Sequence, residues 1–443
     1  MSVIETNSAV TGSLLRFALA LVFVAGCRNS EPKESSSRQQ PVEPHDTPAL
    51  LPDAASISRT TSPGLAVSNL EAGIAELERR IAAGPDRAHL YPQLISLYLI
   101  RAHYLARLDD YQRAVELAAA HVRARPRSAQ PYMLRARVNA ALHRFAAALR
   151  DIDRAEQLGA HASETEAQRA SIWLGLGRHQ DALAVRRELA RRHPGFHTLA
   201  RLAAAHVERG DNKAAETAFG EALAAYRDVS PFDVAGLCFR WGHMYEEAGQ
   251  LIRARHLYQI AHDRLPQYAE AAGHLAGVLA RTGQIERAVS LLKTLVTSTD
   301  DPEYIGQLAE LEKKRGHREV AAQLVLRATA RFETLVHRHP EAFADHAARY
   351  FLTTGDNPVR AFELARRNLA VRQTALAYTL AIEAAMKADA AGDACSIAES
   401  AMTLPQLPRR LLFHAWRAFV GCGHSERADQ LAKRLKIDHS KAP

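Results

Sequence analysis

Alanine recurs at a nearly constant interval along most of the chain, and this interval constrains the fold more than any other feature. The successive spacings are 34, 34, 33, 39, 34, 33, 40 and 67 residues, and Ala394 divides the last into two near-equal parts. The residues that define these spacings are Ala114, Ala148, Ala182, Ala215, Ala254, Ala288, Ala321, Ala361 and Ala428. A period of this size is typical of stacked helix hairpins, each of which buries its apolar face against its neighbours.

The clearest copy of the repeat covers residues 235–266. Its marked residues are Trp241, Gly242, Tyr245, Gly249, Ala254, Tyr258, Ala261 and Pro266. Small residues at Gly242 and Ala254 allow the two helices of one hairpin to touch, and Pro266 ends the second helix. In residue types and spacing this copy resembles the tetratricopeptide repeat family, and weaker copies extend the resemblance over most of the chain. The resemblance implies an all-α fold, a right-handed α-solenoid of about ten helix hairpins over residues 69–436.

The N-terminal part of the sequence predicts export and lipid attachment. Residues 17–25 form an unbroken apolar run, which is too short to span a bilayer and suits a signal peptide. A Val-Ala-Gly-Cys sequence ending at Cys27 resembles the lipobox of bacterial lipoproteins. The resemblance implies a signal peptide over residues 1–26 and acylation of Cys27. Because Arg28 rather than aspartate follows, we expect a lipid-anchored protein at the outer membrane that faces the periplasm. The outer leaflet of the plasma membrane is the alternative.

Composition divides the remainder of the chain. Residues 27–68 are rich in Ser, Pro, Glu and Thr and lack apolar periodicity, so we expect a flexible tether. Residues 69–83 predict a lone amphipathic helix that covers the N-terminal end of the solenoid. Residues 437–443 form a C-terminal tail.

Enzyme signatures and metal-ligand spacings are missing from the sequence, and we expect neither catalysis, a cofactor nor a metal. The formal net charge is +8, which we interpret mainly as solvated helix surface. The densest basic cluster contains Arg186, Arg187, Arg191 and Arg192, and aromatic residues are not interleaved with it as in a nucleic-acid platform. We therefore expect no nucleic-acid partner.

Solenoids of this kind offer a concave surface lined by the first helix of each repeat. Counting along the repeats, as the family resemblance implies, gives a candidate protein-binding groove. Its residues are Glu208, Phe239, His243, Glu246, Glu247, Glu270, Glu303 and Glu310. Acidic residues predominate in it, so a basic partner is one hypothesis.

Three cysteines remain after the lipidated one. Cys238 falls on a first-helix packing position, where we expect a buried free thiol. Cys395 opens the second helix of one repeat and Cys422 closes the first helix of the next. Antiparallel neighbouring helices would bring these two together, so a disulfide is one hypothesis and two buried thiols are the other.

The sequence thus predicts a membrane-anchored scaffold or adaptor for proteins, with envelope assembly or export as one setting. Capture of a peptide or glycan in the groove is the alternative function, and an enzyme is a third and weaker one. Phe239 is the one obvious aromatic residue at the groove positions for stacking on a sugar.

Overall fold

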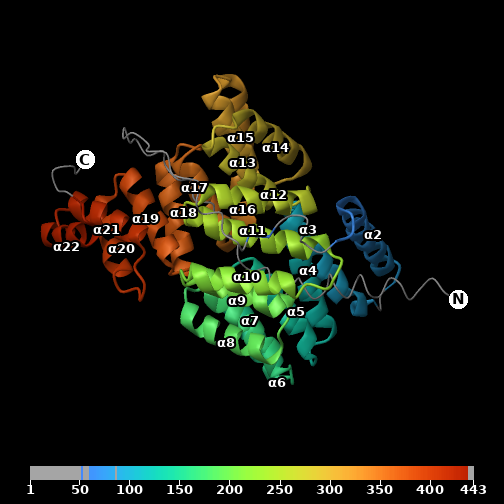
Figure 1. Cartoon of the computed structure of the whole chain (residues 1–443). Coiled ribbons are helices and arrows are strands. Elements are labelled where there is room, and N and C mark those ends of the chain that lie inside the picture. The colour runs from blue at the N-terminus through green and yellow to red at the C-terminus, as the bar shows by residue number, and fades with distance from the viewer. Residues whose placement is uncertain (1–50, 53–58, 85–86, 438–443) are drawn as a thin grey trace.

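The computed structural model describes residues 51–52, 59–84 and 87–437, and within these ranges all regular structure is helical (Figure 1). Helix α2 (Pro63–Ala82) and the 3-10 helix η1 (Ala88–Leu90) precede ten antiparallel hairpins. The first five hairpins are α3 (Tyr91–Leu105) with α4 (Asp109–Ala124), α5 (Ala129–Ala141) with α6 (Phe145–Gln157), α7 (Ala162–Gly175) with α8 (His179–Arg192), α9 (Phe196–Glu208) with α10 (Asn212–Ala224), and α11 (Pro231–Glu247) with α12 (Leu251–Arg264). The other five are α13 (Ala269–Arg281) with α14 (Ile285–Ser298), α15 (Pro302–Lys314) with α16 (Arg318–Arg338), α17 (Pro340–Leu352) with α18 (Pro358–Val371), α19 (Ala375–Lys387) with α20 (Ala391–Ala401), and α21 (Arg409–Gly421) with α22 (Ser425–Leu435). The predicted all-α solenoid is confirmed.

Helix α2 covers the first hairpin, as expected of the lone N-terminal helix, but it begins at Pro63 rather than at residue 69. Proline suits the first position of a helix, because its missing N–H has no partner there in any case. The Ser- and Pro-rich composition of residues 27–68 concealed this start. Cys27, the proposed signal peptide and most of the tether lie outside the described residues, as do residues 438–443 of the tail.

Small residues set the distance between the helices of a hairpin. A Cβ atom added to Gly242 in α11 would lie 2.9 Å from the Tyr258 ring and 3.3 Å from the Ala254 carbonyl oxygen of α12. Both Ala254 and Tyr258 are fully buried. Gly242 and Ala254, the small residues marked in this copy of the repeat, therefore lie where α11 and α12 meet.

The two long intervals in the alanine series have different structural causes. The interval of 39 residues spans a loop after α10 and the 17-residue helix α11, which is longer than the usual first helix. The interval of 40 follows from the 21-residue helix α16, the longest of the described helices. The first interval thus contains a loop, and the second contains an extended second helix, α16.

The solenoid curls so that hairpins far apart in sequence lie side by side. The Leu108 backbone N–H donates to Asp300 Oδ1 at 2.8 Å, and Arg338 Nη1 lies 2.9 Å from Asp109 Oδ1. One hairpin further on, Arg144 Nη2 lies 3.1 Å from His339 Nδ1. These contacts join α3–α6 to α15–α17 and enclose the concave face of the intervening repeats (Figure 1).

The last two hairpins have a small core of their own. Trp416 and Phe419 of α21 pack there among residues of α19, α20 and α22. Cys395 of α20 and Cys422, directly after α21, have Cα atoms 6.2 Å apart, and the structure places their sulfur atoms together as a disulfide. Cys238 is buried as a free thiol, as expected.

Candidate functional site

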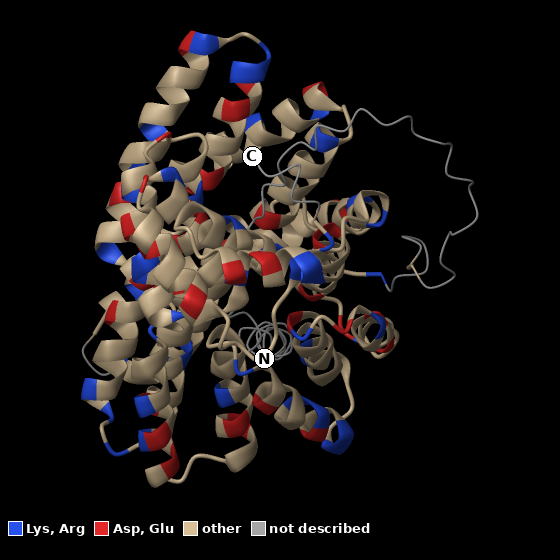
Figure 2. Ribbon diagram, turned by 90° about the vertical axis from the view of Figure 1, so that its left-hand side faces the viewer, with Lys and Arg blue, Asp and Glu red and all other residues tan. Residues whose placement is uncertain are grey.

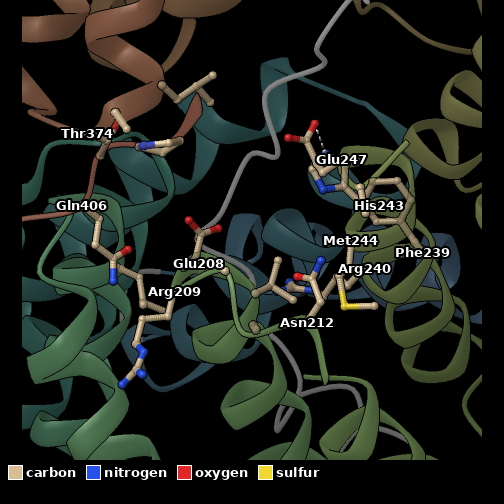
Figure 3. A pocket seen from close by; sticks show the side chains of 18 of the residues that line it. Glu208, Arg209, Asn212, Phe239, Arg240, His243, Met244, Glu247, Thr374 and Gln406 are labelled. Atoms are coloured by element: carbon tan, nitrogen blue, oxygen red, sulfur yellow. Dashed lines mark ion pairs between the residues drawn. The ribbon is translucent and has the colours of Figure 1, made fainter. Parts of the chain in front are cut away.

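A cavity of about 660 Å³ lies on the enclosed concave face of the solenoid (Figure 3). One wall is formed by α9 and α11, and the other by the start of α19 and the loop before α21. His103 of α3 and Glu270 of α13 complete the lining. A volume of this size is within the range of binding pockets for small molecules or single peptide segments.

Five of the eight predicted groove residues line this cavity. They are Glu208, Phe239, His243, Glu247 and Glu270. Figure 3 shows Glu208 on one side and His243 and Glu247 on the other, with Asn212 and Arg240 between them. The other three predicted residues, Glu246, Glu303 and Glu310, lie outside the lining.

Glu246 is paired within the protein rather than presented to a partner. Its carboxylate lies 2.8 Å from His274 Nδ1, and it accepts hydrogen bonds from Arg281 Nη1 at 2.6 Å and Tyr258 Oη at 2.7 Å. Burial favours the neutral acid, but the charge and hydrogen bond of His274 lower the pKa of Glu246 to about 2. Burial likewise disfavours the imidazolium, yet Glu246 raises the pKa of His274 to about 9. Both partners are therefore charged near neutral pH.

Glu303 and Glu310 have partners as well. Glu303 Oε2 lies 3.0 Å from His346 Nδ1, and Lys314 Nζ donates to Glu310 at 2.6 Å. Around the cavity itself, three glutamates (Glu208, Glu247 and Glu270) face three arginines (Arg209, Arg240 and Arg372). The acidic excess that suggested a basic partner is therefore offset in the folded chain.

Phe239 is not an open platform for a ligand. It is 3% exposed, and its ring packs 5.6 Å from that of Tyr258 and 5.3 Å from that of Tyr268, measured between centroids. The other aromatic residues of the lining, Phe219 and Tyr268, are fully buried. Sugar stacking requires an exposed ring face, so the geometry disfavours a glycan as ligand.

The interior also contains arginines that were not among the predicted groove residues. Arg201 and Arg240 each stand two residues before the small residue of a first helix, Ala203 and Gly242 respectively. Other repeats carry a polar residue at the same position: Gln168, His274 and Gln307. A polar residue recurring beside the small one was therefore a signal in the sequence that could have found them.

The basic cluster predicted as solvated surface divides in two. Arg191 and Arg192 are exposed and bind Glu188, as expected of a solvated face. Arg186, in contrast, is 3% exposed and points into the α7–α8 hairpin, where its Nη2 contacts Ser171 Oγ. Elsewhere lysines and arginines are interspersed with aspartates and glutamates along the helices (Figure 2).

The cysteine pair brings a third ligand-type group with it. Cys395, Cys422 and His424 place their sulfur and nitrogen atoms within 4.8 Å of one another. Sulfur atoms joined in a disulfide are not thiolate ligands, so the bonded pair does not form a metal site.

In the described residues, helices long and apolar enough to cross a membrane are absent.

Residues 245–311 match the model of the tetratricopeptide repeat family. No curated protein matches the sequence. Among solved structures, the APC/C hetero-tetramer Cut9-Hcn1 is 15% identical with a TM-score of 0.43, covering 82% of this chain and 65% of that one. Yeast Tom70 is 13% identical with a TM-score of 0.38, covering 85% and 99%. A human IFIT1 dimer with PPP-AAAA is 12% identical with a TM-score of 0.43, covering 84% and 95%.

The chain is thus a helical repeat protein, and residues 245–311 match the tetratricopeptide repeat family. It spans 65% of the length of the Cut9-Hcn1 chain that it matches.

Proposed function

We propose that this chain is a lipid-anchored scaffold or adaptor that holds a segment of a partner protein in the enclosed cavity. The observation that carries the proposal is the cavity itself, about 660 Å³ in volume, with walls from hairpins far apart in sequence. Repeat proteins of this type bind protein segments on their concave face. The lining combines both signs of charge with small residues such as Ala204 and Gly210, which would allow a backbone to approach closely.

The proposed partner need not be basic, because the lining holds as many arginines as glutamates. A peptide is preferred to a glycan because the aromatic rings of the lining are buried. Envelope assembly or export is the setting that the lipobox suggests. We propose a binding role rather than an enzymatic one.

Substitution within the cavity tests the proposal. Ala204→Trp should fill part of the cavity, and Glu247→Lys should change the charge of its lining. Each variant should weaken capture of the partner by tenfold or more, and a factor of ten corresponds to about 1.4 kcal/mol. The measurement is quantitative mass spectrometry of proteins that co-purify with the detergent-solubilised chain. Glu221→Lys, on the exposed face of α10, is the matched control and should leave capture unchanged. Equal capture by all three variants would place the binding surface outside the cavity.

A further inference from the structure

Four arginines from successive hairpins gather behind the α9–α11 wall of the cavity. They are Arg137 of α5, Arg186 of α8, Arg201 of α9 and Arg240 of α11. Arg240 lines the cavity, and Arg201 occupies the equivalent place in α9, one helical turn before the lining residue Ala204. Neighbouring helices of the solenoid thus direct guanidinium groups toward one region.

Three of these arginines lack a carboxylate partner within the described part of the chain. Arg186 is 3% exposed, and its Nε and Nη1 atoms are buried without a hydrogen-bond partner. The Nε atoms of Arg137 and Arg201 are buried and unpartnered as well. The polar contacts that Arg137 and Arg186 do make are with serine hydroxyls, Ser96 for Arg137 and Ser171 for Arg186, which carry no charge.

Other half-buried arginines of the chain are held differently. Arg101 binds Asp110 through two nitrogens at 2.6 and 2.9 Å, and Arg360 binds Glu333 through two at 2.9 and 2.6 Å. Arg135 and Asp151 form the same bidentate pair. The fold therefore supplies carboxylates where arginines serve structure, and Arg137, Arg186 and Arg201 are exceptions.

The cluster is electrostatically unfavourable as it stands. Burial lowers the pKa of Arg186, and the nearby charges of Arg201 and Arg240 lower it further. Burial and the charges of Arg137 and Arg240 lower the pKa of Arg201 to about 10. Among the acids of the lining, Glu270 senses the charge of Arg240, but burial raises the pKa of Glu270 to about 7, so it is only partly ionised at neutral pH. Buried arginines without a carboxylate partner, as Arg137, Arg186 and Arg201 are, are costly, and that cost is relieved when an anion binds between them.

We propose that the four-arginine cluster binds an oxyanion, a carboxylate or a phosphate group, on a ligand that enters the cavity. The planar fork of a guanidinium matches both groups through paired hydrogen bonds. The inference rests on the proposed function, because it names the chemistry of the segment that the same cavity receives. Arg201 and Arg240 contact the oxyanion, and Arg137 and Arg186 add charge behind them.

Direct binding of small anions tests this inference without the partner protein. The full chain in detergent is titrated calorimetrically with inorganic phosphate, with N-acetylglutamate and with neutral N-acetylglutamine, at constant ionic strength. We expect at least one of the two anions to bind, and N-acetylglutamine not to bind. Binding of phosphate alone would identify a phosphate-bearing ligand, and binding of N-acetylglutamate an acidic segment. Absence of binding by both anions would overturn the inference and leave the partner-capture result standing.

Variants assign the binding to the cluster. Arg201→Gln and Arg240→Gln should each weaken the anion that binds by about tenfold or more, the loss expected for a charge-assisted hydrogen bond. Arg201→Lys keeps the charge but loses the planar guanidinium fork. Its affinity for the anion should therefore lie between those of the parent chain and of Arg201→Gln. Arg191→Gln, an exposed arginine of the adjacent hairpin, is the matched control and should bind as the parent does. Equal affinity in all variants would overturn the assignment.

Stability of the ligand-free protein separates a binding role from a structural one. Because Arg201 and Arg186 lack a carboxylate partner when the site is empty, Arg201→Gln and Arg186→Met should leave the Tm unchanged or raise it. The same variants should lose the rise in Tm that the bound anion causes in the parent chain. A lower Tm in both ligand-free variants would show that the arginines stabilise the fold, contrary to the inference.

Discussion

Gly242 illustrates how single residues fix the geometry of this fold. Its Cα hydrogen faces the ring of Tyr258, and nothing larger fits between α11 and α12 at that point. Gly277 of α13 is also inside a first helix, but an added Cβ there would have no neighbour within 4 Å. Two glycines in comparable helices therefore differ in what they do for the protein.

The pair provides a direct test of the packing argument. Gly242→Ala should lower the free energy of unfolding by about 1–3 kcal/mol, because the methyl group must displace Tyr258 or separate the helices. Gly277→Ala should be neutral or stabilising by up to about 1 kcal/mol, since alanine is the better helix former. Urea denaturation followed by circular dichroism measures both. A destabilised Gly277→Ala with an unaffected Gly242→Ala would contradict the interpretation of the repeat.

The buried pair of His274 and Glu246 predicts a specific dependence of stability on pH. The pKa of His274 is raised from 6.5 to about 9, so its contribution is complete below pH 6.5 and is lost as pH rises through 9. The pKa of Glu246 is lowered from 4.5 to about 2, so its contribution is lost only as pH falls from 4.5 through 2. The pair therefore stabilises the fold most between these limits, at about pH 4.5 to 6.5.

Replacing the histidine isolates this effect. In His274→Gln, the decrease in unfolding free energy between pH 6 and pH 9 should be smaller than in the parent, by on the order of 1–3 kcal/mol. Because the charge of His274 also lowers the raised pKa of Glu270, both proteins are compared in a Glu270→Gln background, which removes the titration of Glu270 from this pH range. Urea unfolding at both pH values provides the measurement, and an identical pH dependence in the two proteins would argue against a charged His274.

At the scale of elements, the hairpin turns follow one backbone rule with interchangeable residues. Gly249 ends α11 with a φ of 76°, in the left-handed region that glycine enters without steric cost. In the α5–α6 hairpin His143 takes this place with a φ of 55°, and in the α19–α20 hairpin Asp389 does so with 56°. A residue in the left-handed conformation therefore ends these hairpin turns whether or not it is glycine.

The last two hairpins depend on a small core, and the cysteine pair joins them. The Cα distance of 6.2 Å between Cys395 and Cys422 is within the range that a disulfide requires. A bond that closes a loop of 27 residues should contribute about 3–4 kcal/mol on the chain-entropy argument. Non-reduced peptide mapping of protein isolated without reducing agent should find the linked peptides.

Reduction provides the control for that prediction. A reducing agent should lower the Tm of the parent chain and leave that of the Cys395→Ala/Cys422→Ala variant unchanged. Cys238→Ala, which alters the buried free thiol, should retain the sensitivity to reductant. Two free thiols in the isolated protein would mean that the cysteines serve only as small core residues.

At the scale of the whole molecule, closure of the superhelix and attachment to a membrane are separate matters. Closure depends on contacts such as that of Asp300 with Leu108, and Arg331 also binds Asp300 at 2.9 Å. The proposed attachment to a membrane would depend on Cys27, in the N-terminal part of the sequence.

Anchoring is tested by changing the proposed acylation site. Cys27→Ala should abolish incorporation of labelled palmitate and move the protein from the membrane fraction to the soluble one. Acyl chains contribute about 0.8 kcal/mol per buried methylene group, so their loss should release nearly all of the protein. Cys238→Ala serves as the control and should remain acylated. A Cys27→Ala protein that still carries palmitate would exclude this cysteine as the lipid site.

The sequence by itself determined the repeat, its period, the residues at which paired helices touch and five of the residues that line the cavity. These properties are local, because each hairpin contacts mainly its neighbours and repeats one pattern. Only the tertiary structure decided which charged side chains are paired or buried within the protein. Glu246 was predicted to face a partner, and it binds His274 and Arg281 from the next repeat. Arg186 was predicted to be solvated, and it is buried beside Arg201. Curvature brings α3–α6 against α15–α17, and pairing between residues more than a hundred positions apart leaves no period in a sequence.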